Sequence, residues 1–181
     1  PDWAVKGYAE EAIVSLVGGG YPKGIIEAMP IKDIDSLNFP DYTPFGVDDM
    51  MDNYSLATRL LYRYSRENPR LYPIVTARGC VWNCSFCVDH RRSYRERSID
   101  NIKEEIRINY ERYHFNILLI LDELFAVNKQ RMRAFCAMVL EGKKEYDWDF
   151  DWQFQTHASA RLDLETLQLA KQAGCVSFSY G

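Results

Sequence analysis

The sequence predicts an α/β fold in which strands and helices alternate to build a parallel sheet. From residue 72 onward, four apolar, strand-like runs are separated by three amphipathic helical patterns. This order and spacing are typical of βαβ units, whose crossovers are right-handed and whose strands are parallel. A second observation is that chemically reactive residues directly follow the strand-like runs. Ligands bind at the carboxyl ends of the strands in such a sheet or barrel, so both observations indicate a site at that edge.

Composition limits the classes of function. The chain has 181 residues, which suffices for one ordinary domain with its own core and is short for two. Its 22 Lys and Arg against 26 Asp and Glu leave no overall positive field that would favour nucleic acid or an anionic membrane. The longest apolar runs, such as 117–121, are far too short to cross a bilayer, so we expect no membrane span.

The cysteines indicate a reducing compartment. Three of the five are clustered, and Cys136 and Cys175 lie inside apolar segments, which disfavours a secreted disulfide framework. We interpret Cys136 and Cys175 as small buried residues rather than ligands. The protein is therefore expected in the cytoplasm. Because the chain starts at Pro1 and stops at Gly181 directly after a strand-like run, we also expect a fragment of a longer protein.

The first part of the chain shows a short helix and a linker. Residues 3–17 carry a helical pattern, and the glycine triplet 18–20 is expected to end it as a plain loop. No helix pattern follows the triplet, which disfavours a phosphate cradle there. Residues 31–54 contain several prolines and no sustained period, which predicts an ordered linker. Its expected anchors are the apolar side chains Leu37, Phe39, Tyr42 and Phe45.

The remaining elements follow in order. The predicted strands are 72–77, 116–121, 147–155 and 175–180. The third strand is predicted by unbroken alternation of polar and aromatic residues. Its aspartates lack the glycine and the distal glutamate of a calcium loop. The predicted helices follow the N-cap Ser98, start near Asn128, and follow the N-cap Asp163, with Gly174 ending the last one.

Polar residues follow each predicted strand, as a site at the carboxyl edge requires. These residues are Cys80, Cys84 and Cys87 after the first strand, Asp122 and Glu123 after the second, Gln155, Thr156 and His157 after the third, and Gly181 after the fourth. His157 is a candidate proton donor or ligand, and a hydrogen-bonded polar residue beside the pocket is an equal alternative.

The three clustered cysteines predict a soft metal centre. Three residues separate Cys80 from Cys84 and two separate Cys84 from Cys87, so one loop can wrap its thiolates around a single centre. Such a set suits an iron–sulfur cluster or zinc. For zinc, His90 would complete a structural Cys3His set. For a cluster, an iron without a protein ligand can bind a small molecule.

The motif Cys80-x-x-x-Cys84-x-x-Cys87, with Phe86 before its last cysteine, resembles the hallmark loop of the radical S-adenosylmethionine (SAM) enzymes. Other motifs resemble the subgroup that carries an N-terminal cobalamin (B12)-binding domain. These motifs are Arg97-Ser98, Asp122-Glu123-x-Phe125-x-x-Asn128, Arg161 and Ala173-Gly174-Cys175. The segments 7–10 and 33–37 are similar to the tail of that upstream domain and its linker. The resemblance implies a B12-binding-like remnant with linker over 1–71 and the N-terminal portion of a radical SAM barrel over 72–181.

The resemblance also implies cofactors and their residues. Cys80, Cys84 and Cys87 would hold three irons of a [4Fe-4S] cluster, and SAM would chelate the fourth. Reductive cleavage of SAM would then give a 5′-deoxyadenosyl radical that acts on an unknown substrate, with an electron donor such as a flavodoxin or ferredoxin. The implied SAM-binding residues are Phe86 along the adenine, Asp122 or Glu123 at the amino group, Thr156 and Gly181.

The resemblance finally implies where this chain departs from the family. The family's TIM-like (β/α) barrel has six strands, so a partial barrel truncated after about four strands is expected. Cobalamin is expected to bind only in the full-length protein, because no Asp-x-His-x-x-Gly motif is present. A separate alternative is RNA binding by the basic stretch 91–97, against which a solvated loop is favoured.

Overall fold

A computed structural model describes residues 2–20, 22–29, 31–53, 66–87 and 93–181. The chain divides into two compact units, Pro1–Leu37 and Asn38–Gly181, and each is described by itself. No helix in the described part of the chain is long and apolar enough to cross a membrane.

The first unit is a small βαβ element. Strand β1 (Trp3–Lys6) pairs in parallel with β2 (Gly24–Glu27), and helix α1 (Glu10–Val17) connects them. A 3-10 turn, η1 (Ile34–Ser36), follows. The helix predicted over 3–17 is wrong for its first residues, because the backbone of Trp3–Lys6 forms ladder hydrogen bonds with β2. Gly18 ends α1 as expected.

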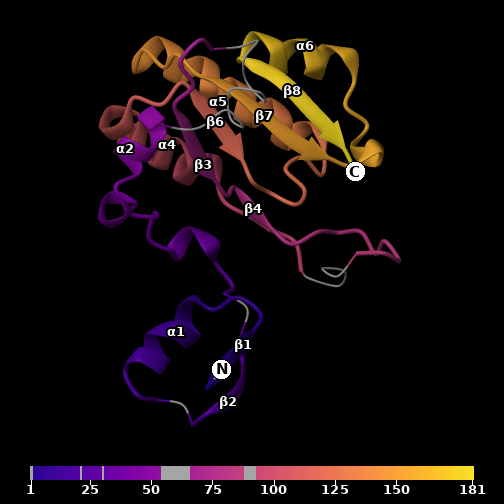
Figure 1. Cartoon of the computed structure of the whole chain (residues 1–181). Coiled ribbons are helices and arrows are strands. Elements are labelled where there is room, and N and C mark those ends of the chain that lie inside the picture. Colours follow the sequence, from indigo (N-terminus) through magenta and orange to yellow (C-terminus); the bar gives the residue numbers. More distant parts are fainter. Residues whose placement is uncertain (1, 21, 30, 54–65, 88–92) are drawn as a thin grey trace. The chain divides into compact units, whose positions relative to one another are not determined.

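The second unit is built around a four-stranded parallel sheet. Its strands are β3 (Leu71–Ile74), β6 (Ile117–Ile120), β7 (Asp151–Thr156) and β8 (Cys175–Tyr180). They lie in the order β3-β6-β7-β8, and every neighbouring pair is parallel (Figure 1). The predicted α/β class, with four parallel strands, is confirmed.

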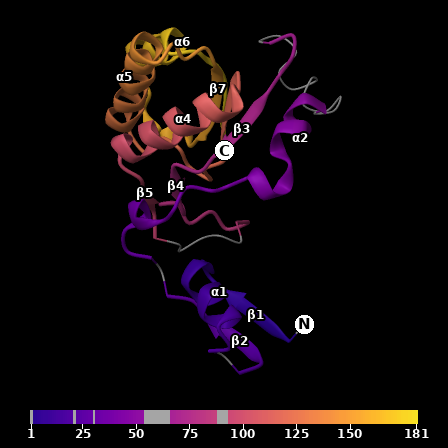
Figure 2. The same cartoon turned by 90° about the vertical axis from the view of Figure 1, so that its left-hand side faces the viewer.

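In the described part of the chain, three long helices pack beside this sheet (Figure 2). They are α4 (Ile99–Tyr113), α5 (Lys129–Glu145) and α6 (Leu164–Gln172). Each begins at a polar cap, because the side chains of Ser98, Asn128 and Asp163 accept hydrogen bonds from backbone amides in the first turn. The predicted helix starts are therefore confirmed, and Gly174, with φ +100°, follows the end of α6.

The helix-facing side of the sheet is aromatic. In β7, Trp152 and Phe154 are buried in the core, whereas Gln153 and Gln155 alternate with them and are more exposed. Phe125 and Phe135 pack edge-on against each other next to Trp152. This alternation confirms the period-two pattern and fixes which side chains face away from the helices.

The third strand is shorter than predicted. The alternating pattern begins at residue 147, yet β7 begins at Asp151. Asp147 has a positive φ of 54°, and Trp148 is buried against Gly142 of α5. Packing of Trp148 against the helix therefore overrides the local strand pattern at 147–150.

The predicted linker contains regular structure that the sequence reasoning missed. Within the described part of 31–54 lie the 3-10 turn η2 (Thr43–Phe45) and helix α2 (Val47–Asn53), besides η1. Met51 is 2% exposed and belongs to the core, and Tyr42 packs edge-on against Tyr72. Phe45 is 73% exposed, so its predicted anchoring role is wrong.

Candidate functional site at the carboxyl edge of the sheet

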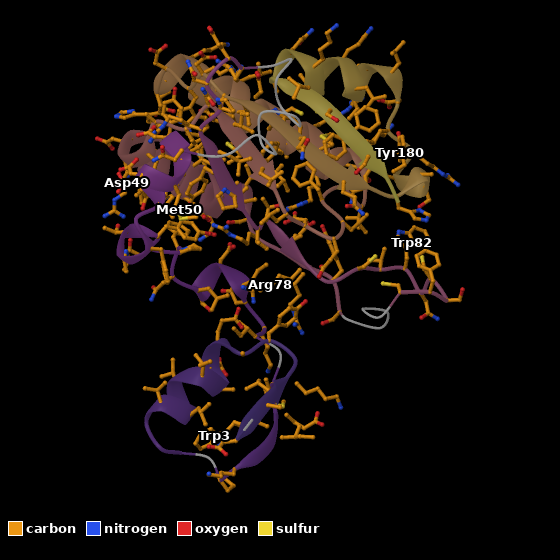
Figure 3. The ribbon with its side chains drawn as sticks, viewed as in Figure 1. Trp3, Asp49, Met50, Arg78, Trp82 and Tyr180 are labelled. Atoms are coloured by element: carbon orange, nitrogen blue, oxygen red, sulfur yellow. The ribbon has the colours of Figure 1, made fainter. Side chains whose placement is uncertain are left out.

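The three clustered cysteines lie on a loop that a short ribbon closes at its base. Strand β4 (Ala77–Arg78) pairs antiparallel with β5 (Arg95–Glu96). We call residues 79–94, which these strands enclose, the cysteine loop; Figure 3 labels Arg78, at the end of β4, and Trp82, within the loop. Since β3 leads into β4, the loop leaves the sheet at the carboxyl end of the first parallel strand, where the sequence predicted it.

The three cysteines are half-buried. The amide of Cys87 donates to the carbonyl of Cys84 at 3.0 Å, which makes a turn, and the amide of Trp82 donates to Cys80 Sγ at 3.5 Å. No three His, Cys, Asp or Glu side chains among the described residues converge on a point that could hold a metal. The donor chemistry still fits a soft metal centre, because three unbridged thiols share one loop. His90, the fourth ligand of the zinc alternative, lies outside the described residues.

Asp122 follows β6 and is turned into the protein. It is 4% exposed, and its two carboxylate oxygens accept hydrogen bonds from the amide and the hydroxyl of Thr76, at 2.6 and 2.5 Å. Burial raises the pKa of Asp122 to about 6, while the hydrogen bonds from Thr76 oppose that rise. The guanidinium of Arg131 donates to the carbonyl and hydroxyl oxygens of Thr76. Asp122 thus ties the end of β6 to the segment that enters the cysteine loop.

Glu123 holds the first residue of the cysteine loop. Its Oε2 accepts a hydrogen bond from the amide of Gly79 at 2.8 Å. Gly79 has a φ of +80°, a conformation that favours glycine. The two adjacent carboxylates therefore fix successive points of one segment: Asp122 binds Thr76, and Glu123 binds Gly79.

An aromatic stack joins the cysteine loop to the end of β7. The rings of Trp82 and His157 lie 4.3 Å apart between centroids, with an interplanar angle of 23°. His157 Nδ1 also accepts a hydrogen bond from the amide of Ser159 at 3.2 Å, which caps the 3-10 turn η3 (Ala158–Ala160). The sequence placed His157 at this edge, but it contained no signal that Trp82 would be its partner.

The other predicted SAM-binding residues differ from one another in burial. Phe86 is 88% exposed. Thr156 is buried, and its hydroxyl donates to the carbonyl of Ala126 at 2.9 Å. The amide of Gly181 donates to the carbonyl of Thr156 at 2.9 Å, so these two residues are neighbours at the ends of β7 and β8. The structure thus brings Thr156 and Gly181 together and brings Glu123 to the cysteine loop.

The basic stretch 91–97 is only partly a free surface. Arg97 is buried and forms an ion pair with Glu105, which is 1% exposed and also accepts from the hydroxyl of Tyr72. Arg95 lies in the ribbon strand β5. Arg91 and Arg92 lie outside the described residues. Arg97 therefore serves the fold, which weakens the case for an RNA surface.

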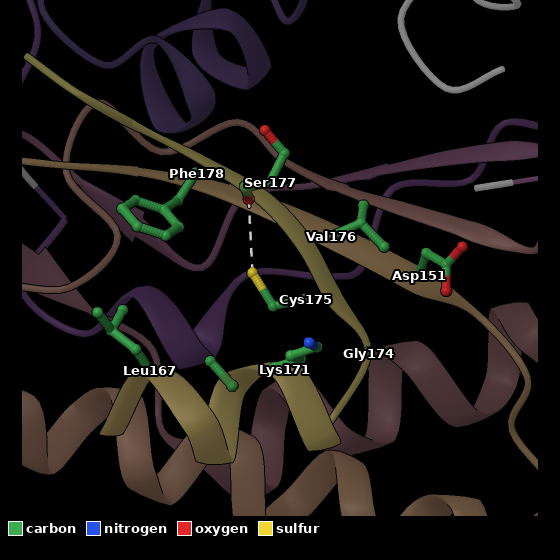
Figure 4. A pocket seen from close by; sticks show the side chains of 9 residues that line it. Asp151, Leu167, Lys171, Gly174, Cys175, Val176, Ser177 and Phe178 are labelled. Carbon is green, nitrogen blue, oxygen red and sulfur yellow. Dashed lines mark hydrogen bonds between the residues drawn. The ribbon is translucent and has the colours of Figure 1, made fainter. Parts of the chain in front are cut away.

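Hollows adjoin the sheet in the described part of the chain. One, of about 370 Å³, lies over the face whose side chains include Leu119, Leu121, Gln153, Gln155, Ser177 and Ser179. Another, of about 680 Å³, lies between β8 and α6 (Figure 4). Cys175 lines the second hollow and its Sγ donates to the carbonyl of Ser177 at 3.4 Å. Burial raises the pKa of Cys175 to about 12, so its thiol stays protonated, unlike a metal ligand.

The comparisons with curated proteins find enzymes. The chain is 25% identical over 194 aligned residues to the anaerobic magnesium-protoporphyrin IX monomethyl ester cyclase of Cereibacter sphaeroides, covering 99% of this chain and 31% of the cyclase. It is 24% identical to an uncharacterised methyltransferase of Pyrococcus horikoshii, covering 83% of this chain and 29% of that protein. The chain thus spans about a third of the length of these relatives or less. No family model matches it.

The comparisons with solved structures find the same fold. The radical SAM methyltransferase TsrM of Kitasatospora setae, bound to tryptophan and a SAM analogue, matches with a TM-score of 0.54 and 19% identity over 61% of this chain and 21% of TsrM. The cobalamin-dependent radical SAM enzyme OxsB, with aqua-cobalamin and SAM bound, matches with a TM-score of 0.50 and 20% identity over 60% of this chain and 18% of OxsB. The predicted resemblance is therefore confirmed at the level of the fold.

Proposed function

We propose, from the premise that this chain is a relative of the radical SAM superfamily, that its cysteine loop holds a [4Fe-4S] cluster and that its strand ends bind SAM. One observation carries the proposal: three cysteines in the spacing Cys80, Cys84, Cys87 lie on a loop that leaves the first parallel strand and is tied to the end of the second by Glu123. When both are bound, the chemistry they supply is one-electron cleavage of SAM to methionine and a 5′-deoxyadenosyl radical.

In this proposal, residues of this chain bind the cluster and SAM and orient them toward each other. Cys80, Cys84 and Cys87 supply three thiolates, which leaves one iron of a four-iron cluster for SAM. Glu123 presents its carboxylate to the cationic amino group of SAM beside the root of the cysteine loop. Phe86, whose ring is exposed, packs along the adenine.

The remaining predicted site residues shape the strand ends. Thr156 and Gly181 place backbone polar groups at the ends of β7 and β8, where SAM can extend along the edge. Both oxygens of Asp122 already bind Thr76, so its role in the proposal is to fix the strand end beside Glu123.

The partners follow from this chemistry. The cluster requires reduction, so we propose a small electron-transfer protein of the flavodoxin or ferredoxin type, in the cytoplasm. Cobalamin remains a proposal for the full-length protein only. A structural Cys3His zinc site is the alternative that the experiment below separates from a cluster.

The test compares two cysteine substitutions after anaerobic reconstitution with iron and sulfide. Wild type is expected to bind about four irons per chain, to absorb as a brown protein that bleaches with dithionite, and to release 5′-deoxyadenosine from SAM. Cys84→Ala is expected to lose the iron and the product. Cys136→Ala is the matched control, because Cys136 is fully buried in α5 and its burial raises the pKa of its thiol to about 12.

Two outcomes would contradict the proposal. Equal iron loss in Cys84→Ala and Cys136→Ala, with both variants folded by circular dichroism, would show that the cysteine loop is not the iron site. A colourless wild-type protein that holds one zinc tightly would favour the structural zinc site instead.

A further inference from the structure

We infer that Trp82 and His157 form a latch that positions the cysteine loop over the end of β7, and this inference rests on the proposed function of that loop. His157 is a positioning residue here, because it acts through Trp82. The latch is the stack of the two rings, 4.3 Å apart between centroids and 23° from parallel.

His157 is itself held in place. Its Nδ1 lies 3.2 Å from the donating amide of Ser159 and 2.8 Å from the Ser159 hydroxyl oxygen. Because a backbone amide donates to Nδ1, the neutral imidazole carries its proton on Nε2. The ring is therefore fixed by the turn that follows β7, and it presents a flat face on which an indole can stack.

Because it stacks on the fixed ring of His157, Trp82 can restrain the part of the loop that carries the thiols. It lies two residues from Cys80 and two residues from Cys84, and its amide donates to Cys80 Sγ at 3.5 Å. Trp82 keeps 38% of its surface exposed, whereas Phe86 in the same loop keeps 88%. Of these two loop aromatics, Trp82 is thus the one that the sheet edge holds.

The latch acts together with the hydrogen bond from Gly79 to Glu123. That bond fixes the root of the loop to the end of β6, and the stack fixes its middle to the end of β7. The segment from Gly79 to Cys84 is therefore held at two points on neighbouring strands. A loop restrained before its ligand arrives loses less conformational entropy on binding, which strengthens binding without a new contact.

The first measurement is made on the metal-free 181-residue chain. Hydrogen exchange of the amides at 80–84 is expected to quicken about twofold to tenfold in Trp82→Ala and in His157→Ala, which is the range for loss of one aromatic pair. The double variant is expected to exchange no faster than either single variant, because both remove the same contact. Val81→Ala, at the exposed neighbour of Trp82, is the matched control and should leave the exchange unchanged.

The second measurement separates positioning from mere stability. After reconstitution, His157→Ala is expected to retain its iron but to need about twofold to tenfold more SAM to change the electron paramagnetic resonance signal of the reduced cluster. His157→Phe, which keeps a ring for Trp82, should restore most of the wild-type SAM dependence.

The two proposals fail in different ways. Unchanged exchange at 80–84 in His157→Ala, or additive effects of the two alanine substitutions, would overturn the latch whether or not iron binds. A wild-type SAM dependence in His157→Ala would overturn its positioning role. Failure of the wild-type chain to assemble a cluster would instead reject the proposed function, and the exchange data would still decide whether the latch exists.

Discussion

At the scale of single residues, Asp122 and Asp163 show how burial decides the sign of a pKa shift. Both carboxylates accept hydrogen bonds from the amide and hydroxyl of a threonine, Thr76 and Thr166 respectively. Asp163 is only partly buried, so its hydrogen bonds hold its pKa well below the usual value. Asp122 is buried, so desolvation wins and raises its pKa from 3.8 to about 6.

The first prediction follows from this raised pKa. A carboxyl whose pKa is higher in the folded than in the unfolded protein favours folding most when it is protonated. The stabilisation that Asp122 contributes to the free energy of unfolding is therefore largest below about pH 4 and is lost as the pH rises through about 6. Relative to Asp122→Asn, which cannot ionise, the wild-type free energy of unfolding is expected to fall by about 2 kcal/mol between about pH 4 and pH 7. Denaturant unfolding of both proteins at several pH values measures this difference.

Asp163→Asn is the control, since its wild-type carboxylate has a lowered pKa. Its pH dependence should have the opposite sign: wild type gains stability over the variant as the pH rises, and loses that gain in acid. A pH-independent difference between wild type and Asp122→Asn would show that Asp122 is not desolvated as the structure describes.

The same residue shows what the sequence could predict about the site. The strand pattern placed Asp122, Glu123, Thr156 and His157 at one edge of the sheet, because parallel strands bring their carboxyl ends together. It could not assign their partners, since those depend on side-chain directions between distant segments. Thr76 and Arg131, which complete the surroundings of Asp122, carry no motif that marks them.

At the scale of elements, packing against α5 explains where the third strand begins. A β-carbon added at Gly142 would lie 2.0 Å from Cε3 of Trp148. The close approach of the indole to the helix therefore requires glycine at residue 142. The same packing of Trp148 on α5 keeps residues 147–150 out of the sheet.

The second prediction is that Gly142→Ala destabilises the protein although alanine favours helices. Replacing a helical glycine by alanine ordinarily gains about 1 kcal/mol. Here the overlap with Trp148 should outweigh that gain and cost about 1–3 kcal/mol of unfolding free energy, measured by denaturant unfolding.

The background for this comparison is Trp148→Ala, which removes the overlapping ring. There the same Gly142→Ala change should become stabilising by about 1 kcal/mol. A loss of stability in both backgrounds would show that the glycine is needed for some reason other than the indole.

The sequence predicted helices and strands correctly wherever the local pattern of a segment agrees with its packing in the fold. The caps at Ser98 and Asp163 predicted two helix starts, because a side-chain cap is a local interaction. The helix expected from about Asn128 proved to begin at a side-chain cap as well. The errors fall where tertiary pairing overrides the local pattern, as when β2 recruits Trp3–Lys6 into a strand. The sequence did not predict helix α2, because two prolines lie shortly before it and aspartates recur among its seven residues, so no helical pattern stands out.

At the scale of the whole molecule, the two units differ in how much core each possesses. The main hydrophobic cluster draws only on residues of the second unit, from Tyr42 to Cys175. In the described part of the first unit, the buried apolar side chains are Ala12, Ile26, Ile31 and Ile34. A segment of this size rarely buries enough surface to fold alone, whereas a chain the size of the second unit commonly does.

The last prediction compares two fragments that start at different residues. Fragment 38–181 keeps the whole cluster and should retain the circular dichroism and cooperative unfolding expected of the sheet and helices. Fragment 72–181, which starts at the domain boundary predicted from sequence, loses Met51 and the edge contact of Tyr42 with Tyr72. It should be less stable than fragment 38–181 by about 2 kcal/mol or more, because deleting one buried side chain of this size already costs about that much. Equal stability of the two fragments in urea would show that residues 38–71 are not part of the second unit's core, in agreement with the domain boundary between residues 71 and 72 that the sequence predicts.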